Sequence, residues 1–368
     1  MSLPFLRPTW AEVDLNKFKA NLLKVRDMVG PDVKILALLK ANAYGHGAVE
    51  LGKFAEKNSL CQFFGVASVE EGMELRQAGL QMPTLVLGSI YPFEAFEYAI
   101  KNRLAVTIAS MDAARAVADV AAKTDAKALC HVKQDTGMGR IGTRRGEVLH
   151  ILEFLDKNPH VILDGLYTHL SSADCDPDYT EEQIGYFRDT LTGVSLQGLH
   201  INTCHLSATP GMMRRPDTFF DMVRPGHAEF GLEKGFEPIL SLKTRIVYVK
   251  DVAEGASLSY GRSFICPKAM RVATIPLGYG DGFLRSLSNK AQVLVRGRRC
   301  RVLGNITMDM CMIDITDVPG ATVGDEVTVT GKQGEEEIRF SELAQLAGTI
   351  DYELTTLIMP RVPRFYKE

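Results

Sequence analysis

The sequence predicts an α/β protein in which a (β/α)8 TIM-like barrel is followed by a C-terminal antiparallel β domain. Short apolar runs alternate with amphipathic stretches over the first two thirds of the chain, which is typical of β-α units that build a parallel sheet. From residue 237 the pattern changes to β-branched runs broken by Gly, Pro and Asp, which indicates antiparallel strands. The 368 residues suffice for two domains.

The apolar runs are the predicted barrel strands. They are apolar throughout rather than alternating, because barrel strands are buried on both faces. A doubly wound open sheet is the competing arrangement, but it requires a G-x-G-x-x-G phosphate loop after its first strand, and none follows residue 39. The eight predicted strands span residues 33–39, 63–67, 83–88, 104–109, 128–132, 161–168, 199–206 and 221–231.

Helices are expected between these strands, and two of them have recognisable starts. Ser68 with Glu71, and Thr180 with Gln183, have the spacing of a capping box, in which a hydroxyl and a carboxylate or carboxamide pair with main-chain N–H groups. Both pairs therefore predict helix N-termini.

The second domain is expected to consist of strands and one short helix. The helix is predicted from Ser341, in SELAQLA. We place the domains at residues 1–236 and 237–368, with residues 1–15 as candidates to join the β domain. The predicted strands are LKTRIVYV, RVATIPLG, AQVLVRG, RVLGNI, CMIDI and DEVTVTG.

Composition excludes several classes of partner. Lys and Arg total 42 against 45 for Asp and Glu, without long runs of one sign, which argues against nucleic acid and anionic membranes. No segment approaches the roughly 18 apolar residues of a membrane span, and no secretory leader is recognised. The seven Cys lack C-x-x-C spacing, so no disulfide framework or metal site is indicated and a cytoplasmic location is expected.

Lys40 is the first candidate for chemistry, because it closes the first apolar run. In a barrel, catalytic residues project from the carboxyl ends of the strands. Partial burial there lowers the pKa of a lysine, and the neutral amine is the form that condenses with an aldehyde. A lysine whose amine reaches solvent at a strand end is the plain alternative. Other polar residues at predicted strand ends are Lys133, Arg140, His169, Ser207 and Arg224.

Eight segments resemble, in order and spacing, the successive motifs of alanine racemases. LLKANAYGHG at 38–47 is similar to the family's pyridoxal-phosphate lysine motif, and the resemblance extends over nearly the whole chain. The other segments are VKQDTGMGRIG (132–142), GLYTHLSSAD (165–174), MVRPG (222–226), LSYG (258–261), GYGDG (278–282), TMDM (307–310) and RVPR (361–364).

The resemblance implies a set of residues for the cofactor, pyridoxal phosphate. Lys40 would carry it covalently, and Arg224 would lie against the pyridine nitrogen, which a guanidinium leaves unprotonated. Residue Ser207 is assigned to the phosphate, with Thr203 as the alternative; Leu206 then stands where the family has Asn. The remaining implied cofactor residues are Tyr44, His169, and the main chain near Gly226 and His227.

Racemisation needs a base on each face of the substrate Cα, since a proton leaves one side and another arrives on the other. By resemblance these bases are Lys40 and Tyr260, the latter from the second subunit of a homodimer. An unperturbed Tyr pKa near 10 is too high for this role, so a neighbouring cation is expected to lower it, with His169 and Arg140 as candidates.

Further residues are implied for substrate binding. Arg140 would clamp the alanine carboxylate, and Lys133 matches a lysine that is carbamylated in many family members. The main-chain N–H of Met308 would also bind the carboxylate, with Asp309 beside it and Tyr279 narrowing the entrance, all from the partner subunit.

The implied activity is the interconversion of L- and D-alanine for peptidoglycan synthesis. Pro360 stands where the family has Tyr beside the cofactor, so a broader amino-acid or serine racemase is the nearest alternative. A decarboxylase on the same scaffold, and a non-enzymatic pyridoxal-phosphate carrier, are the remaining alternatives, but neither requires Tyr260.

Overall fold

The structure is a computed structural model that describes residues 6–368. By compactness the chain divides into two units, which we describe separately. The barrel unit comprises residues 19–43 and 48–229, and the sheet unit comprises the described residues up to 18 together with 44–47 and 230–368.

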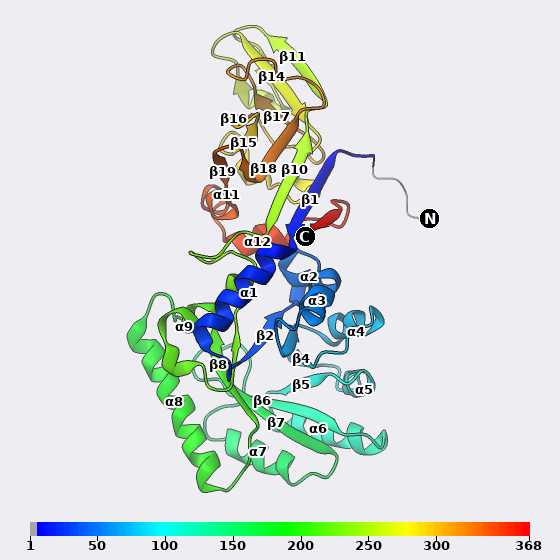
Figure 1. Cartoon of the computed structure of the whole chain (residues 1–368), viewed down its shortest axis with the longest axis vertical. Coiled ribbons are helices and arrows are strands. Elements are labelled where there is room, and N and C mark those ends of the chain that lie inside the picture. Colours follow the sequence, from blue (N-terminus) through cyan, green and yellow to red (C-terminus); the bar gives the residue numbers. More distant parts are fainter. Residues whose placement is uncertain (1–5) are drawn as a thin grey trace. The chain divides into compact units, whose positions relative to one another are not determined.

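The barrel unit confirms the predicted (β/α)8 architecture. Strands β2 to β9 are parallel and close into a barrel in sequence order, because β9 pairs back with β2. Figure 1 shows helices α3 to α8 on the outside of this barrel. The strands are β2 (Lys34–Leu38), β3 (Phe63–Val66), β4 (Thr84–Val86), β5 (Ala105–Ile108), β6 (Ala128–Lys133), β7 (Val161–Tyr167), β8 (Thr203–Ala208) and β9 (Met222–Arg224). The helices from α1 to α10 are α1 (Leu15–Val29), α2 (Lys40–Tyr44), α3 (Ala48–Lys57), α4 (Val69–Gln77), α5 (Ala95–Lys101), α6 (Met111–Lys123), α7 (Val148–Asp156), α8 (Pro177–Leu196), α9 (Thr209–Arg214) and α10 (Gly226–Glu229).

Two of the predicted barrel strands differ in extent from the structure. The seventh begins at Thr203, later than the predicted 199. The eighth ends at Arg224, because Pro225 has no N–H to donate to a neighbouring strand and α10 begins at Gly226.

One predicted helix start is wrong. Helix α8 begins at Pro177, and the side chain of Asp176 accepts a hydrogen bond from the N–H of Tyr179 at 3.0 Å. Proline suits a first helical turn, where its missing N–H would have no partner within the helix. Thr180 and Gln183 therefore lie inside the helix, and the Thr180 hydroxyl donates to the Asp176 carbonyl.

The interior of the barrel contains polar side chains as well as aliphatic ones. His131 and His205 are completely buried, Tyr167 is 2% exposed and Arg224 is 3% exposed. These residues come from β6, β7, β8 and β9, so one side of the barrel interior is a buried polar cluster.

The sheet unit confirms the predicted antiparallel domain. Its main sheet has the order β11-β14-β17-β16-β15-β18-β10-β1-β20, with β19 paired to β18, and only β1 and β20 pair in parallel. Strands β12 and β13 form a separate hairpin. The strands are β1 (Thr9–Asp14), β10 (Leu240–Arg245), β11 (Tyr248–Val252), β12 (Ser257–Leu258), β13 (Phe264–Ile265), β14 (Met270–Ile275), β15 (Gln292–Val295), β16 (Arg298–Leu303), β17 (Cys311–Asp314), β18 (Glu326–Gln333), β19 (Glu336–Ile338) and β20 (Arg364–Lys367).

Two details of this unit differ from the prediction. The run LKTRIVYV is divided between β10 and β11 rather than forming one strand. The predicted helix is α11 (Phe340–Ala347), but a second helix, α12 (Asp351–Thr356), follows it and was not predicted. Its six residues are too few to give a clear helical period.

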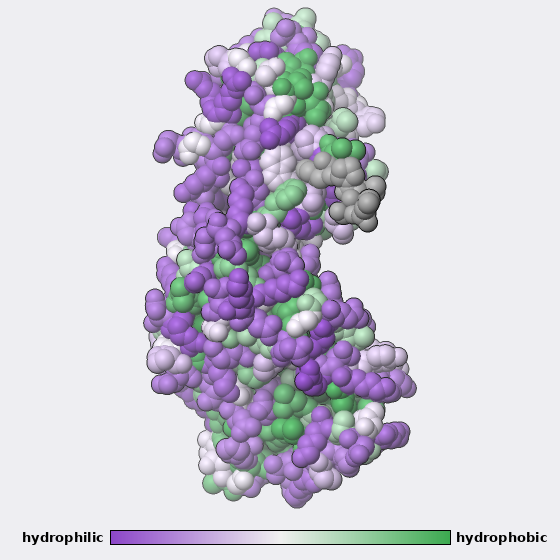
Figure 2. All heavy atoms as spheres, turned by 45° about the vertical axis from the view of Figure 1, so that its right-hand side comes forward, coloured by the Kyte–Doolittle hydropathy of each residue, from purple (hydrophilic) through white to green (hydrophobic). Residues whose placement is uncertain are grey.

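Most side chains on the face drawn in Figure 2 are hydrophilic, with small hydrophobic groups between them. Within residues 6–368, no helix is both long enough and apolar enough to span a membrane.

Candidate active site

Lys40 lies just beyond the end of β2, after Leu39, and begins a left-handed turn. The next four residues, Ala41 to Tyr44, have φ between 50° and 53°. Left-handed backbone costs roughly 1–2 kcal/mol for each residue that has a Cβ. Such a strained segment persists only where its surroundings hold it, and it places Lys40 at the carboxyl end of the strand.

Specific hydrogen bonds hold the turn. Glu71 Oε1 accepts from the N–H of Ala41 at 2.7 Å, and the second oxygen of the same carboxylate accepts from the N–H of Ala67 at 2.6 Å. Asn42 Oδ1 accepts from the N–H of Ala48 at 2.9 Å. Glu71 thus joins the end of β3 to the turn after β2, a role that the sequence did not indicate.

The capping box predicted at Ser68 is only half formed. Ser68 Oγ accepts from the N–H of Glu71 at 3.4 Å, so α4 does begin there. The Glu71 carboxylate binds Ala67 and Ala41 instead of returning to the N–H of Ser68.

The carboxyl ends of the barrel strands carry a group of cations. Burial lowers the pKa of Lys40, and the nearby guanidiniums of Arg140 and Arg224 lower it further, while Glu71 opposes the shift. Lys133 is 4% exposed, and burial together with Arg224 and Arg140 lowers its pKa to about 8. Both lysines therefore lose a proton more readily than a solvated lysine.

Arg224 is held in place from several sides. Its Nη1 donates to His205 Nδ1 at 2.7 Å, and its Nη2 donates to the carbonyls of Thr168 and Leu206 at 2.9 and 2.8 Å. Burial lowers the pKa of this guanidinium to about 10, so it remains charged at neutral pH. Leu206 itself is completely buried.

His169 and Arg140 differ in charge and setting. Burial, followed by the charges of Arg224 and Lys133, lowers the pKa of His169 to about 3. The expectation that His169 could be a cation near Tyr260 is therefore wrong, because this imidazole is neutral at neutral pH. Arg140 is exposed, at the end of a loop in which Asp135 Oδ1 accepts from two glycine N–H groups.

The two hydroxyls considered for the phosphate lie at opposite ends of β8. Ser207 is completely buried near the carboxyl end, and its Oγ is 2.5 Å from Thr218 Oγ1. Thr203 begins the strand and accepts a hydrogen bond from Lys34 Nζ at 3.0 Å. Only Ser207 is therefore at the end of the barrel where Lys40 lies.

Thr209 is a neighbouring residue that the sequence did not indicate. Its Oγ1 accepts from the N–H groups of His227 and Ala228 at 3.1 and 3.3 Å, which fixes the start of α10 at Gly226. A threonine after a strand commonly begins a turn or helix, so the residue type of Thr209 alone did not indicate its contact with α10.

Tyr44 belongs to the sheet unit, although it lies four residues after Lys40. Its ring centroid is 5.1 Å from that of Phe230 and 6.2 Å from that of Tyr352. Aromatic packing therefore fixes this side chain within the sheet unit.

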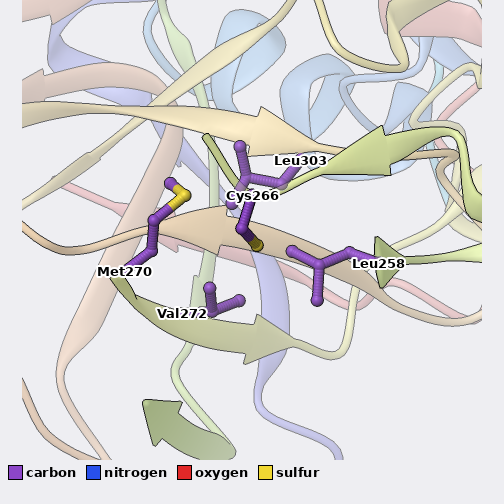
Figure 3. Packing of buried hydrophobic residues seen from close by; sticks show 5 residues of the cluster. All are labelled: Leu258, Cys266, Met270, Val272 and Leu303. Atoms are coloured by element: carbon purple, nitrogen blue, oxygen red, sulfur yellow. The ribbon is translucent and has the colours of Figure 1, made fainter. Parts of the chain in front are cut away.

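Tyr260 lies in the loop of the β12–β13 hairpin and is 76% exposed. Asn305 holds this loop, because its Nδ2 donates to the Tyr260 carbonyl at 2.9 Å and its carbonyl accepts from Ser259 Oγ at 2.7 Å. The hairpin is anchored by a small apolar cluster shown in Figure 3: Leu258, Cys266, Met270, Val272 and Leu303.

Tyr279 and Met308 lie on two adjoining loops of the sheet unit. The N–H of Tyr279 donates to the Thr307 carbonyl at 3.0 Å, and the N–H of Gly280 donates to the Met308 carbonyl at 2.9 Å. Tyr279 is 41% and Met308 54% exposed. A Cβ on Gly278 would lie 2.2 Å from the Thr307 carbonyl oxygen, so this close approach requires glycine.

A network of charges organises the same loops. The completely buried Asp281 accepts from Arg361 Nε at 2.8 Å and from Arg7 Nη2 at 2.8 Å. Arg361 Nη1 also donates to Asp309 Oδ1 at 2.8 Å. The sequence placed Asp309 at the site but missed Asp281, Arg361 and Arg7, whose pairing joins distant parts of the chain. Pro360, next to Arg361, is exposed.

The predicted site residues therefore fall into two groups, one in each unit. The barrel unit brings together the ends of strands β2, β6, β7, β8 and β9, with Lys40, Lys133, Arg140, His169, Ser207, Arg224, Gly226 and His227. The sheet unit carries Tyr44, Tyr260, Tyr279, Met308 and Asp309.

Comparison with protein families gives two matches that together span nearly the whole chain. Residues 13–234 match the family model "Alanine racemase, N-terminal domain". Residues 239–366 match "Alanine racemase, C-terminal domain".

Curated proteins and solved structures agree with these matches. The chain is 39% identical to an alanine racemase of Halothermothrix orenii and 41% identical to one of Symbiobacterium thermophilum, each over 100% of this chain and 99% of the relative. An alanine racemase structure from Clostridium difficile 630 superimposes with a TM-score of 0.93 at 35% identity, covering 99% of this chain and 97% of the other. The Bacillus anthracis alanine racemase, solved with bound L-Ala-P, gives 0.92 at 34% identity, covering 100% and 96%.

Proposed function

This chain belongs to the alanine racemase family of isomerases, and we propose that it interconverts L-alanine and D-alanine with pyridoxal phosphate as cofactor and supplies D-alanine for peptidoglycan in the cytoplasm. The observation that carries the proposal is Lys40, whose pKa burial lowers at the carboxyl end of β2. A lysine with a lowered pKa at that end of a barrel is suited to covalent attachment of an aldehyde.

The charges of the barrel unit fit this cofactor and substrate. Lys40, Lys133, Arg140 and Arg224 act on one another electrostatically, which indicates a cationic cluster at the strand ends. Such a cluster suits an anionic phosphate and an amino-acid carboxylate. Ser207 is the hydroxyl at this end of β8, so we prefer it to Thr203 for the phosphate, together with Tyr44 and the main chain near Gly226 and His227.

When bound, pyridoxal phosphate supplies an aldehyde that condenses with amines and a ring that withdraws electrons from the substrate Cα. Arg224, fixed by His205 and two carbonyls, would present a charged donor to the ring nitrogen, and His169 would pack beside the ring as a neutral imidazole. Because Arg224 keeps its proton at neutral pH, the ring nitrogen would stay unprotonated.

Proton transfer would involve two residues. Lys40 Nζ would remove or return the proton on one face of the substrate Cα, since burial lowers its pKa and so makes the neutral amine more accessible than in a solvated lysine. The partner subunit's Tyr260 would act on the opposite face through its phenolic oxygen. The high exposure of Tyr260 and Met308 on the sheet unit is consistent with a surface that a second copy covers.

Other residues would bind and orient the substrate. Arg140 would hold the alanine carboxylate, with the Met308 N–H, Asp309 and Tyr279 supplied by the partner subunit. Lys133 has a pKa of about 8, so its neutral form is accessible for addition to carbon dioxide. Its Nζ would form the N–C bond and release a proton, and the resulting anion would orient Arg140.

The experiment incubates the pyridoxal-phosphate-loaded protein with single enantiomers of alanine, serine and lysine in D₂O and follows chirality and Cα deuteration together. Deuteration with loss of chirality for alanine alone is the expected result. The same result for several amino acids would favour the broad racemase, which the exposed Pro360 motivates. Bound cofactor without exchange for any of the three would contradict the proposed activity.

A further inference from the structure

A continuous line of hydrogen bonds crosses the interior of the barrel unit. It begins at Arg224 Nη1, which is 2.7 Å from His205 Nδ1. The other ring nitrogen of this histidine, Nε2, is 3.2 Å from His131 Nδ1, and His131 Nε2 is 3.1 Å from Asp164 Oδ2. The four residues come from β9, β8, β6 and β7, and both imidazoles are completely buried.

The hydrogen-bond direction along this line is determined by its first member. A guanidinium only donates, so His205 Nδ1 must accept and the single proton of a neutral His205 lies on Nε2. That proton is donated to His131 Nδ1, which leaves the His131 proton on Nε2, facing Asp164. Burial and the charge of Arg224 lower the pKa of His205 far below its ordinary value, in agreement with a neutral ring.

The strand geometry makes room for this line. A Cβ on Gly165 would lie 2.1 Å from His131 Nδ1, so the ring occupies space that only glycine leaves free. The register between β6 and β7 shifts at Cys130 and His131, and Asp164 is the extra residue of this bulge. Bulges redirect side chains, and here the carboxylate reaches His131. Tyr167 stacks on His205 with ring centroids 4.5 Å apart.

Asp164 is the anionic end of the line. Its Oδ1 accepts from Asn202 Nδ2 at 3.1 Å. The hydrogen bond from His131 lowers the pKa of this carboxyl. The hydrogen bond from Asn202 and the charge of Lys34 lower it further. Lys34 and Asn202 mark the amino-terminal ends of β2 and β8, so the line runs from the carboxyl end of the barrel strands toward the opposite end.

We propose that Asp164 is a positioning residue for Arg224. Its carboxylate polarises His131, which in turn makes His205 Nδ1 a stronger acceptor for the guanidinium. Polarisation along a hydrogen-bonded chain strengthens each member. The consequence for catalysis rests on the proposed function, in which Arg224 faces the cofactor ring; the effect on the two imidazoles does not depend on it.

The test measures the ¹⁵N resonances of the histidine rings in the cofactor-free protein, labelled at histidine. The wild type should show His205 with Nδ1 unprotonated and Nε2 protonated. Asp164→Leu removes the acceptor and should move the His205 resonances, although the line of hydrogen bonds connects Asp164 to His205 only through His131. Asp164→Asn keeps an oxygen acceptor and should restore them.

Two results would overturn the proposal. One is a wild type in which His205 populates both tautomers, a test that requires no variant to fold. The other is an Asp164→Leu protein in which the resonances of His131 change and those of His205 do not. Gly165→Ala, which displaces the His131 ring, should move the His205 resonances as well. Ile162→Asn, at an exposed position of the same strand, is the matched control and should leave them unchanged.

The loaded enzyme supplies a second readout. Asp164→Leu weakens the hydrogen bonding that positions Arg224, which should lower kcat about 3- to 10-fold and leave KM for alanine unchanged. Asp164→Asn should recover most of the lost kcat. An unchanged kcat, or a change in KM alone, would contradict the positioning role. A wild type that racemises no amino acid would instead contradict the proposed function, and the resonance test would still decide the effect of Asp164 on His205.

Discussion

Glu71 Oε1 accepts a hydrogen bond from the N–H of Ala41 at 2.7 Å, and this bond fixes the first residue after Lys40 in a left-handed conformation. Its other oxygen binds the N–H of Ala67, so one carboxylate connects the loops after two neighbouring strands. The position of the candidate attachment lysine therefore depends on a residue thirty-one positions further along the chain.

Replacing Glu71 with Ala should destabilise the protein by about 1 kcal/mol, because the N–H groups of Ala41 and Ala67, two exposed residues, lose a charged acceptor. It should also accelerate hydrogen exchange at the Ala41 N–H. Chemical denaturation and exchange mass spectrometry measure both effects. Glu71→Gln, which keeps one oxygen acceptor, should be milder, and Glu74→Ala on the exposed side of α4 should change neither. Equal effects from Glu71→Ala and Glu74→Ala would contradict the role of Glu71.

Lys40→Ala should abolish covalent attachment of pyridoxal phosphate. Borohydride reduction followed by peptide mass spectrometry measures this directly, with the label expected at Lys40 in the wild type. Lys133→Met is the matched control, because it removes the other lysine of the cationic cluster and should keep the label. Label that persists elsewhere in the Lys40→Ala protein would show that the assignment is wrong.

Lys133 should react with carbon dioxide in a pH range set by its pKa of about 8. A lowered pKa means that the neutral amine accumulates as pH rises through that value, so carbamate should increase from about pH 7 to about pH 9. Nuclear magnetic resonance with ¹³C-bicarbonate detects the carbamate carbon. The signal should disappear in Lys133→Met and persist in Lys53→Ala, which changes an exposed lysine. A carbamate signal that remains in Lys133→Met would show that Lys133 is not the reacting lysine.

Asp281→Asn should cost about 2–4 kcal/mol of folding free energy, because a completely buried carboxylate would no longer balance Arg7 and Arg361. Asp309→Asn is the control. Its carboxylate is exposed and pairs with Arg361 at the surface, so its loss should cost about 1 kcal/mol or less. Thermal and chemical unfolding compare the two, and similar costs would refute the central role of Asp281 in these loops.

The sequence located strands correctly where the spacing of its apolar residues directly reflects burial. All eight barrel strands were located, because runs such as 63–67 are buried on both faces. The ends of strands and helices were predicted less well. Pro225 determines where β9 ends, and Asp176 determines where α8 begins. Neither residue changes the apolar pattern from which the elements were located. Local chemistry at single residues, rather than periodicity, decides such boundaries.

Residues that act through the main chain or through distant partners could not be found from the sequence. Glu71 and Thr209 bind backbone N–H groups, which leave no trace in residue pattern. Arg361 and Asp281 are 80 positions apart and pair only in the folded protein. The neutral state of His169 likewise depends on burial beside Arg224 and Lys133. By contrast, the sequence predicted Lys40 at the end of the first apolar run, and it predicted Arg224 within the eighth run, whose strand ends at Arg224 in the structure.

In the proposed reaction, Lys40 and the partner subunit's Tyr260 act on opposite faces of the substrate Cα. The most direct measurement compares Cα deuteration of D-alanine and L-alanine in D₂O by the wild type and by Tyr260→Phe, both loaded with pyridoxal phosphate. Tyr260→Phe should still bind the cofactor but lose solvent exchange much more severely for one enantiomer than for the other. Equal loss for both enantiomers would contradict the two-base assignment.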